Sequence, residues 1–272
     1  MKRAPAPAKL NFALVVGPRT AGGKHRVTTV LQRIDLFDRI ALRPAPELRI
    51  RGFSEDTLVR EALELLAREG RVTPGWQVEL NKRVPVAAGL GGGSSDAATA
   101  LRLANETLEL PLPQERLHAL AAQLGADVPF FLEPGPQLGE GDGSELRALE
   151  LPQDFWVVLL LPKGVRKLST SAAYEAFDRR GGEQGYEERR RKLLEALGRI
   201  RRARDLAALP PNDLASSPLA AELLAAGAFR ADVSGAGPAV YGLFSSRRNA
   251  ERARRAAGRH GETWLTVPAW YG

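Results

Sequence analysis

Glycines, hydroxyls and a carboxylate are concentrated in residues 85–101, which read PVAAGLGGGSSDAATAL. Gly89 and the three glycines at 91–93 allow positive φ angles, so backbone N–H groups can approach a ligand closely. The alanine-rich residues that follow are strong helix formers, and a glycine loop therefore leads into a helix N-terminus. Amides and the positive end of the helix dipole at such a junction attract an anion, and phosphate is the expected one.

A tight turn is the structural alternative for the same residues, with Ser94 or Ser95 as the helix cap and Asp96 offsetting the dipole. One glycine would be enough for that turn, and four glycines cost backbone entropy, so we favour the phosphate loop. The stretch is neither a Walker A loop, since no Gly-Lys-Ser/Thr follows, nor a dinucleotide-binding glycine pattern. It predicts a third type of phosphate site.

Asp127 is a carboxylate that could act as a general base. It stands just after a predicted helix at 114–124 and before Pro129, so the proline ring fixes the backbone there. Phosphoryl transfer to an alcohol needs a group that accepts the hydroxyl proton, and a carboxylate within hydrogen-bond reach can accept it. Aspartates are also common in turns after helices. From the spacing alone, the catalytic and the structural interpretation of Asp127 are equally good.

The composition is that of a globular protein of 272 residues, 44% hydrophobic and 26% charged, which is long enough for one large or two modest domains. The chain has no cysteine and only His25, His118 and His260, so we expect neither a zinc site nor a catalytic thiol. No apolar run approaches the roughly 20 residues of a membrane span, and the first residues lack a signal peptide's apolar region. We therefore expect a cytoplasmic protein without membrane contact.

The net charge of +7 would permit binding of nucleic acid or of small anions. Much of the excess lies in residues 179–204, where arginines alternate with acidic and apolar residues. That pattern fits a solvated helix face better than a nucleic-acid patch, because aromatic side chains for base stacking are nearly absent. We expect no nucleic-acid partner, and a basic RNA-binding module is the alternative from a different functional class.

The order of the predicted elements indicates an α+β protein with a boundary near residue 150. In the first half, strands are expected at 8–16, 27–31, 39–43, 48–51 and 76–82, helices at 57–68, 95–108 and 114–124, and turns at 133–145. In the second half, we expect a strand at 155–161, helices at 169–179, 186–202 and 214–224, a strand, turn and strand over 232–244, a helix at 247–258 and a strand ending at 267. The strand at 76–82 delivers the chain to the glycine loop.

Four separated motifs resemble the GHMP small-molecule kinases: PAKLN at 7–11, KRVPVAAGLGGGSSDAA at 82–98, LGADVPFF at 124–131 and SGAGP at 234–238. The resemblance implies a two-domain α+β fold, with a ribosomal-S5-domain-2-like N-terminal domain over 1–150 that binds ATP. A ferredoxin-like C-terminal domain would follow over 151–272, with ATP and substrate in the cleft between the domains.

PAKLN together with GADVPFF is similar to one branch of this family. Its members transfer the γ-phosphoryl group of ATP to the 2-hydroxyl of a methylerythritol that carries a cytidine diphosphate, in non-mevalonate isoprenoid biosynthesis. Kinases of homoserine, mevalonate or sugars share the glycine motif and are the alternative within the family. The resemblance implies a small-molecule partner, and we expect a monomer or a weak homodimer.

The resemblance also assigns catalytic and ATP-binding roles. It makes Asp127 the general base, and Lys9 would keep Asp127 ionised and stabilise charge on the transferring group. Asn11 would face the same way as Lys9 and bind substrate, although Lys9 could also be an ordinary lysine at a strand end. ATP would be bound by Lys82, Gly89, Leu90, Gly91, Gly92, Gly93, Ser94 and Ser95. Mg²⁺ would accompany the phosphates, and no protein ligand is assigned to it.

The cytidyl end of the substrate is assigned by the same resemblance. His25 would contact the cytosine and Tyr174 would stack on it, while an exposed loop histidine and a packed helix tyrosine are the structural alternatives. The family often has an aromatic residue before this histidine, but here the residue is Lys24, whose stem and charge could cover the open face of the base. Gly235 and Gly237 resemble a turn that closes over the substrate phosphates, and a tight hairpin would explain them equally well.

Overall fold

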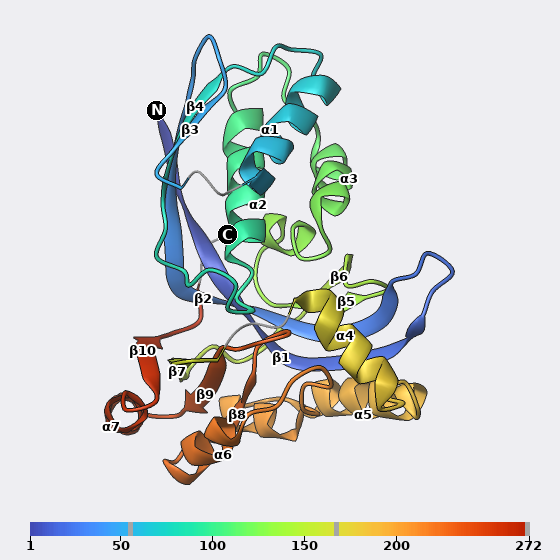
Figure 1. Cartoon of the computed structure of the whole chain (residues 1–272), viewed down its shortest axis with the longest axis vertical. Coiled ribbons are helices and arrows are strands. Elements are labelled where there is room, and N and C mark those ends of the chain that lie inside the picture. The colour runs from blue at the N-terminus through green and yellow to red at the C-terminus, as the bar shows by residue number, and fades with distance from the viewer. Residues whose placement is uncertain (54–56, 166–168, 270–272) are drawn as a thin grey trace.

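A long β-hairpin forms the spine of the molecule, as the computed structural model shows (Figure 1). The residues that the structure describes are 1–53, 57–165 and 169–269. The hairpin strands are β1 (Lys2–Arg19) and β2 (His25–Pro44), which pair antiparallel over most of their length. The register shifts at three places inside β1, and the first two lie on either side of Lys9, the predicted catalytic lysine.

Strand β2 corrects one prediction, because 27–31 and 39–43 were expected to be separate strands and belong to one. The apolar pattern is interrupted between them by polar residues, which suggested a break. Gln32 and Asp38 are nevertheless fully buried and Arg33 is nearly so. Buried polar side chains with partners hide a continuous strand from a hydrophobicity pattern.

Six strands form the first sheet, in the order β3-β4-β2-β5-β6 with β1 paired to β2. The further strands are β3 (Arg49–Arg51), β4 (Trp76–Asn81), β5 (Gln137–Glu140) and β6 (Glu145–Ala148). Residues 133–145 were expected to form turns only, and this was wrong because β5 and the start of β6 lie there. Gly139 stands inside β5, where a Cβ atom would lie 2.9 Å from the carbonyl oxygen of Gly143. Gly139 therefore allows the backbone of the following turn to approach β5 closely.

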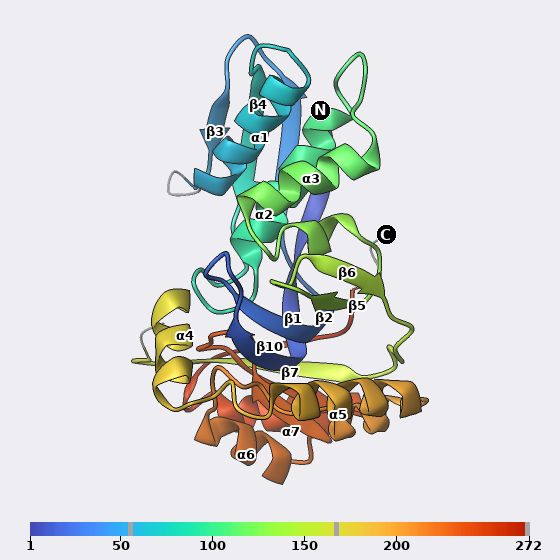
Figure 2. The same ribbon diagram turned by 90° about the vertical axis from the view of Figure 1, so that its right-hand side faces the viewer.

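Three helices cover one face of this sheet (Figure 2). They are α1 (Thr57–Glu69), α2 (Gly92–Asn105) and α3 (Gln114–Leu124), and the short 3₁₀ helix η1 (Pro129–Leu132) follows. Their buried side chains form one core with β2 and β4. The alanines of α2 are all buried, and their small side chains allow this helix to lie against the sheet and against α1.

The second sheet has the strand order β10-β7-β9-β8, all antiparallel. Its strands are β7 (Trp156–Pro162), β8 (Arg230–Val233), β9 (Val240–Phe244) and β10 (Gly261–Thr266). The helices are α4 (Thr170–Arg179), α5 (Tyr186–Arg199), α6 (Pro218–Ala225), α7 (Arg247–Ala257) and the 3₁₀ helix η2 (Ala203–Ala208). Helix α6 begins later than the expected residue 214 because Ser217 caps it and Pro218 occupies its first turn.

The two sheets share a hydrophobic core. Leu10 and Phe12 of β1 belong to the same buried cluster as Leu159 of β7, Leu193 of α5 and Tyr241 of β9. Helices α6 and α7 pack on the second sheet through a separate cluster. The sheets divide between β6 and β7, while the domain boundary at residue 150 stays a prediction. Among the described residues, no helix has the length and apolar character that crossing a membrane requires.

Candidate active site

A cavity of about 850 Å³ lies where the glycine loop, the β1–β2 hairpin, α4 and the turn between β8 and β9 meet. Its size is in the range of small-molecule sites. Most of the residues predicted for the site line it: Lys9, Asn11, Lys24, His25, Lys82, Gly89, Leu90, Gly91, Gly92, Gly93, Ser94, Asp127, Tyr174 and Gly235. Ser95 is fully buried, and neither Ser95 nor Gly237 belongs to the lining of this cavity.

The glycine loop becomes helical earlier than expected. Helix α2 begins at Gly92, and its cap is Gly91 in the left-handed conformation with φ 68°. The prediction of a helix start at Ser95 was wrong, and so was the alternative of a serine cap. The first N–H groups of a helix lack an intrahelical partner, and here they belong to Gly92, Gly93 and Ser94 beside the cavity. These amides and the helix dipole can bind an anion.

Close approach explains two of the glycines. A Cβ atom on Gly89, whose φ is 82°, would lie 2.3 Å from the carbonyl oxygen of Ser234. A Cβ atom on Gly91 would lie 3.0 Å from Cγ of Lys9. Gly93 differs, because a Cβ atom there would meet nothing within 4 Å. Packing thus accounts for Gly89 and Gly91, while Gly93 leaves open space at the helix N-terminus.

Lys9, Asn11 and Asp127 converge at the cavity. Nζ of Lys9 lies 3.4 Å from Oδ2 of Asp127 and donates a hydrogen bond to Oδ1 of Asn11 at 2.6 Å. The amide of Asn11 is fixed in turn, because its Nδ2 donates to Oγ1 of Thr29 at 2.8 Å. The side chain of Lys9 is 4% exposed and that of Asp127 is 43% exposed. A buried cation thus faces a carboxylate that a substrate hydroxyl can reach.

Lys82 is held by two buried carboxylates that the sequence did not identify as its partners. Its Nζ donates to Oδ2 of Asp38 and to Oδ2 of Asp96, each at 2.6 Å. Burial lowers the pKa of Lys82, but the attraction of Asp96 and the hydrogen bonds to both aspartates outweigh burial and raise it. Oδ1 of Asp38 also accepts a hydrogen bond from the amide of Val84 at 2.8 Å. The cluster therefore restrains the segment that enters the glycine loop, and the charge of Lys82 is already shared.

The side chains predicted to bind cytosine lie together. The rings of His25 and Tyr174 are stacked, with centroids 4.8 Å apart and planes 15° from parallel. His25 is 6% exposed, so the alternative of an exposed loop histidine is wrong. Its Nδ1 lies 2.8 Å from the carbonyl oxygen of Gly17, and its Nε2 lies 3.1 Å from Oδ1 of Asp178. Burial raises the pKa of the Tyr174 phenol to about 12, so the ring is neutral at physiological pH.

Lys24 is directed to the turn between β5 and β6, a partner that the sequence did not reveal. Its Nζ lies 2.6 Å from Oδ2 of Asp142, which also lines the cavity. Hydrogen bonds from Lys24 and from Ser144 lower the pKa of Asp142, and this carboxylate is therefore ionised at neutral pH. The sequence analysis assigned no role to the residues of this turn, so it did not predict that Asp142 lines the cavity.

The second glycine turn lies beside the Lys9–Asn11 pair. Gly235 and Gly237 have positive φ angles of 55° and 75°. A Cβ atom on Gly235 would lie 3.4 Å from Oδ1 of Asn11 and 3.6 Å from Nζ of Lys9. The two glycine segments are also bonded to each other, since Oγ of Ser234 donates to the carbonyl oxygen of Gly89 at 2.9 Å. The second glycine turn is therefore part of the wall of the site, next to Lys9 and Asn11.

One cavity therefore combines a helix N-terminus suited to phosphate with a buried lysine and an accessible carboxylate. Together with the two-sheet fold, it defines the class of small-molecule kinases. The family described as GHMP kinases N terminal domain matches residues 57–135, and GHMP kinases C terminal matches residues 188–263. The chain belongs to the GHMP kinase family, and the expected two-domain α+β fold is confirmed.

Individual relatives support the same assignment. A Geobacter sulfurreducens protein named 4-diphosphocytidyl-2-C-methyl-D-erythritol kinase is 37% identical over 265 residues, or 91% of each chain. A Chlorobium phaeobacteroides protein of the same name is 35% identical over 96% of this chain and 95% of its own. The crystal structure of a 4-(cytidine 5'-diphospho)-2C-methyl-D-erythritol kinase superposes with a TM-score of 0.79 at 29% identity, covering 98% of this chain and 99% of that chain.

A more distant solved structure shares the fold. The mevalonate kinase of L. major in complex with R-mevalonate has a TM-score of 0.74, with 17% identity and coverage of 100% of this chain and 97% of that chain. At this identity the likeness extends to the fold alone. The architecture therefore does not distinguish between substrates, and the residues of the cavity must do so.

Substitution of Gly89 by alanine tests the contact between the two glycine segments. We expect Gly89→Ala to lower the free energy of unfolding and the rate of phosphoryl transfer, because the new Cβ atom collides with the backbone of Ser234. Gly198→Ala in helix α5 is the matched control, since a Cβ atom there meets nothing within 4 Å. The control should gain about 0.5–1 kcal/mol of helix stability. Urea unfolding and an ADP-release assay measure both effects, and equal behaviour of the two variants contradicts this account.

Proposed function

We propose that this protein transfers the γ-phosphoryl group of ATP to the 2-hydroxyl of 4-diphosphocytidyl-2-C-methyl-D-erythritol, giving the 2-phosphate and ADP in non-mevalonate isoprenoid biosynthesis. The observation that carries the proposal is the Lys9–Asp127 pair, with its 3.4 Å separation, in the cavity that Gly92, Gly93 and Ser94 line. The names of the curated relatives supply the substrate. Kinases of homoserine, mevalonate or sugars are the alternative. The sequence identity favours the cytidyl compound, because it is 37% for the Geobacter sulfurreducens relative and 17% for the mevalonate kinase of L. major.

In the proposed reaction, the first-turn amides of α2 and the helix dipole hold the ATP phosphates. The substrate hydroxyl lies against Asp127, which accepts its proton while the hydroxyl oxygen forms a bond to the γ-phosphorus. The bond from that phosphorus to the oxygen between the β- and γ-phosphates breaks, and ADP leaves. The buried ammonium of Lys9 stabilises negative charge on the hydroxyl oxygen and on the transferring group.

We propose that Mg²⁺ accompanies ATP and neutralises charge on its phosphates. Among the described residues, no group of three or more histidine, cysteine, aspartate or glutamate side chains is placed to hold a metal ion. Ser94 and Asp127, whose side chains carry oxygen atoms, do line the cavity. This donor set fits an ion carried mainly by phosphate and water, as Mg²⁺ usually is in such sites.

We propose that Tyr174 provides the stacking surface for the cytosine and that His25 orients it. The two rings contact each other face to face in this structure. A base that stacks on this face of Tyr174 therefore requires the two rings to separate. Lys24 and Asp142 face each other at the same end of the cavity, where they can meet the polar edge of a pyrimidine.

We propose a cytoplasmic enzyme that acts as a monomer or a weak homodimer and binds no nucleic acid. The arginines at 179–204 support the last point, because several have carboxylate partners. Arg190 pairs with Glu140, and Arg191 pairs with Glu188 and Glu195. Such pairing is typical of a solvated helix face.

A substrate panel tests the proposed function directly. We expect ADP release in a coupled assay with the cytidyl methylerythritol compound, and little release with homoserine or mevalonate. A site with polar groups for a cytosine rejects substrates that lack it, because those groups are then left unpaired. Turnover that is faster with homoserine or mevalonate contradicts the proposal and favours the alternative within the family. Tight RNA binding with a steep salt dependence and without ATP turnover would favour the RNA-binding module.

The catalytic pair is tested by Asp127→Asn and Lys9→Ala. We expect kcat to fall by about 100-fold or more in each, because general base catalysis and charge stabilisation are lost. Asp127 is half exposed, so its variant should keep the stability of the wild type. Glu175→Gln is the matched control, since this exposed carboxylate also lines the cavity and has no assigned role. Wild-type kcat in Asp127→Asn or Lys9→Ala removes that residue from the mechanism.

The stacking role is tested by Tyr174→Ala. We expect KM for the cytidyl substrate to rise by about 10-fold and kcat to change much less, because base stacking contributes to binding in both ground and transition state. Tyr174→Phe keeps the ring and should resemble the wild type, and KM for ATP should not change in either variant. An unchanged KM for the cytidyl substrate in Tyr174→Ala refutes the stacking role.

A further inference from the structure

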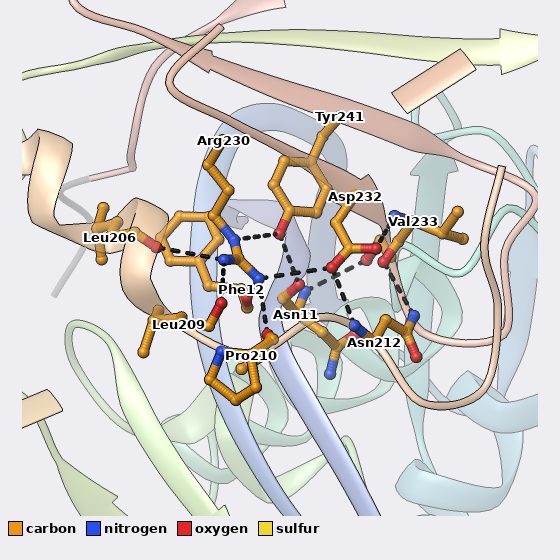
Figure 3. Close-up of polar contacts among 12 residues, drawn as sticks. Asn11, Phe12, Leu206, Leu209, Pro210, Asn212, Arg230, Asp232, Val233 and Tyr241 are labelled. Carbon is orange, nitrogen blue, oxygen red and sulfur yellow. Dashed lines mark hydrogen bonds and ion pairs between the residues drawn. The ribbon is translucent and has the colours of Figure 1, made fainter. Parts of the chain in front are cut away.

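A buried arginine of the second sheet bonds to the backbone of the catalytic strand (Figure 3). Arg230 in β8 is 6% exposed. Its Nη1 donates to the carbonyl oxygen of Leu209 at 2.6 Å, and its Nη2 donates to the carbonyl oxygens of Pro210 at 2.9 Å and of Phe12. One carboxylate, that of Asp232, lies 3.5 Å from the guanidinium. The guanidinium of Arg230 thus bonds mainly to main-chain carbonyl oxygens.

The bonded part of β1 is irregular. The register with β2 shifts between Asn11 and Ala13, which makes Phe12 the extra residue of a β-bulge. A bulge leaves a residue outside the ladder and changes the direction of its neighbours' side chains. Arg230 satisfies the carbonyl oxygen of Phe12, and the hydroxyl of Tyr241 donates to the carbonyl oxygen of Asn11 at 3.1 Å. Two successive carbonyls beside the Lys9–Asn11 pair are therefore fixed by the second sheet.

The same network reaches the second glycine turn through Asn212. The amide N–H of Asn212 donates to Oδ2 of Asp232 at 2.9 Å. Its Nδ2 donates to the carbonyl oxygens of Val233 at 2.9 Å and of Gly235 at 2.6 Å. Figure 3 shows Asp232 between Arg230 and Asn212. Asn212 is 7% exposed and, like Arg230, does not belong to the lining of the cavity.

We propose that Asn212 and Arg230 are positioning residues for phosphoryl transfer: Asn212 holds the turn at Gly235, and Arg230 holds the bulge at Phe12. Together they fix the place of the Lys9–Asn11 pair relative to the glycine turn. This inference rests on the proposed function of the same cavity. Neither side chain touches the substrate, and both act through the backbone of residues that do. Phosphoryl transfer depends mainly on positioning, so an error of about 1 Å in the catalytic pair slows it strongly.

Asn212→Ala tests the proposal. Loss of the two Nδ2 bonds releases the carbonyls of Val233 and Gly235, and we expect kcat to fall by about 100-fold. KM for ATP and for the cytidyl substrate should change by less than about 3-fold, because the groups that contact both ligands remain. This separation of kcat from KM distinguishes positioning from a loss of binding.

Asn105→Ala is the matched control. Asn105 is 6% exposed, and its side chain bonds the backbone of Leu112 twice, with Nδ2 to the carbonyl oxygen at 3.0 Å and Oδ1 to the amide at 2.8 Å. It lies at the far end of α2 from the cavity. We expect its replacement to destabilise the protein comparably and to leave kcat unchanged. Equal losses of kcat in Asn105→Ala and Asn212→Ala would assign the effect to general stability and overturn the proposal.

Two further experiments complete the test: the variant Arg230→Lys, and hydrogen exchange, which does not depend on catalytic turnover. Lysine keeps the charge but cannot bond the same set of carbonyls, so we expect a partial fall in kcat with KM retained. Hydrogen exchange should become faster at 10–12 in Arg230→Lys and at 234–239 in Asn212→Ala. Wild-type exchange and wild-type kcat in these variants overturn the inference. If the wild type fails to phosphorylate the cytidyl compound, the proposed function is wrong, and exchange alone decides whether the network positions these segments.

Discussion

The burial of the Lys9 ammonium is the constraint on which the site depends. An ammonium with a side chain 4% exposed is costly unless its hydrogen bonds and its charge are compensated. Asn11 supplies a hydrogen bond and Asp127 supplies the opposite charge. The carboxylate is the more exposed partner, so the pair orients a reactive group toward solvent from a fixed, buried anchor. A reverse arrangement would leave a flexible lysine at the cavity mouth and a carboxylate out of reach of a substrate.

Backbone contacts keep that anchor in place. The amide of Lys9 donates to the carbonyl oxygen of Leu90 at 2.9 Å, and the amide of Ala239 donates to the carbonyl oxygen of Ala88 at 3.1 Å. Strand β1 and the segment after the second glycine turn are therefore both bonded to the glycine loop. Such contacts require backbones without side chains between them, which is the physical reason for Gly89. The strand that carries Lys9 and the two glycine segments are thus held to one another.

Much of this architecture could be predicted from the sequence, and the failures have physical causes. Helix α3 was predicted with its observed bounds because its period and its flanking proline and glycine are local signals. The length of β2 was missed because Gln32 and Asp38 are buried polar residues. The helix start at Gly92 was missed because glycine has low helix propensity, and the tertiary fold overrides it here.

In the candidate site too, features with local signals were predicted and features that depend on the tertiary fold were missed. The resemblance of two motifs to a kinase family predicted that Lys9, Asn11 and Asp127 share one site, and all three line the cavity. The alternation of side chains along a strand predicted that Lys9 and Asn11 share a face. The two carboxylates around Lys82 and the stack of His25 on Tyr174 come from segments far apart in the chain. No local pattern encodes such pairs. The roles of these residues stay predictions, because geometry alone does not establish what a side chain does in a reaction.

The exposure of Asp127 has a consequence for the order of events. A half-exposed carboxylate is well solvated, and its interaction with Lys9 is weakened by water. When a substrate covers the cavity, water leaves and the same pair interacts more strongly, while the alcohol becomes the nearest proton donor. In the proposed mechanism, Asp127 is therefore most effective as a base once both ligands are bound. An alcohol that cannot cover the cavity leaves water beside Asp127. In the proposed mechanism, the cytidyl end therefore contributes to the rate through desolvation as well as through binding.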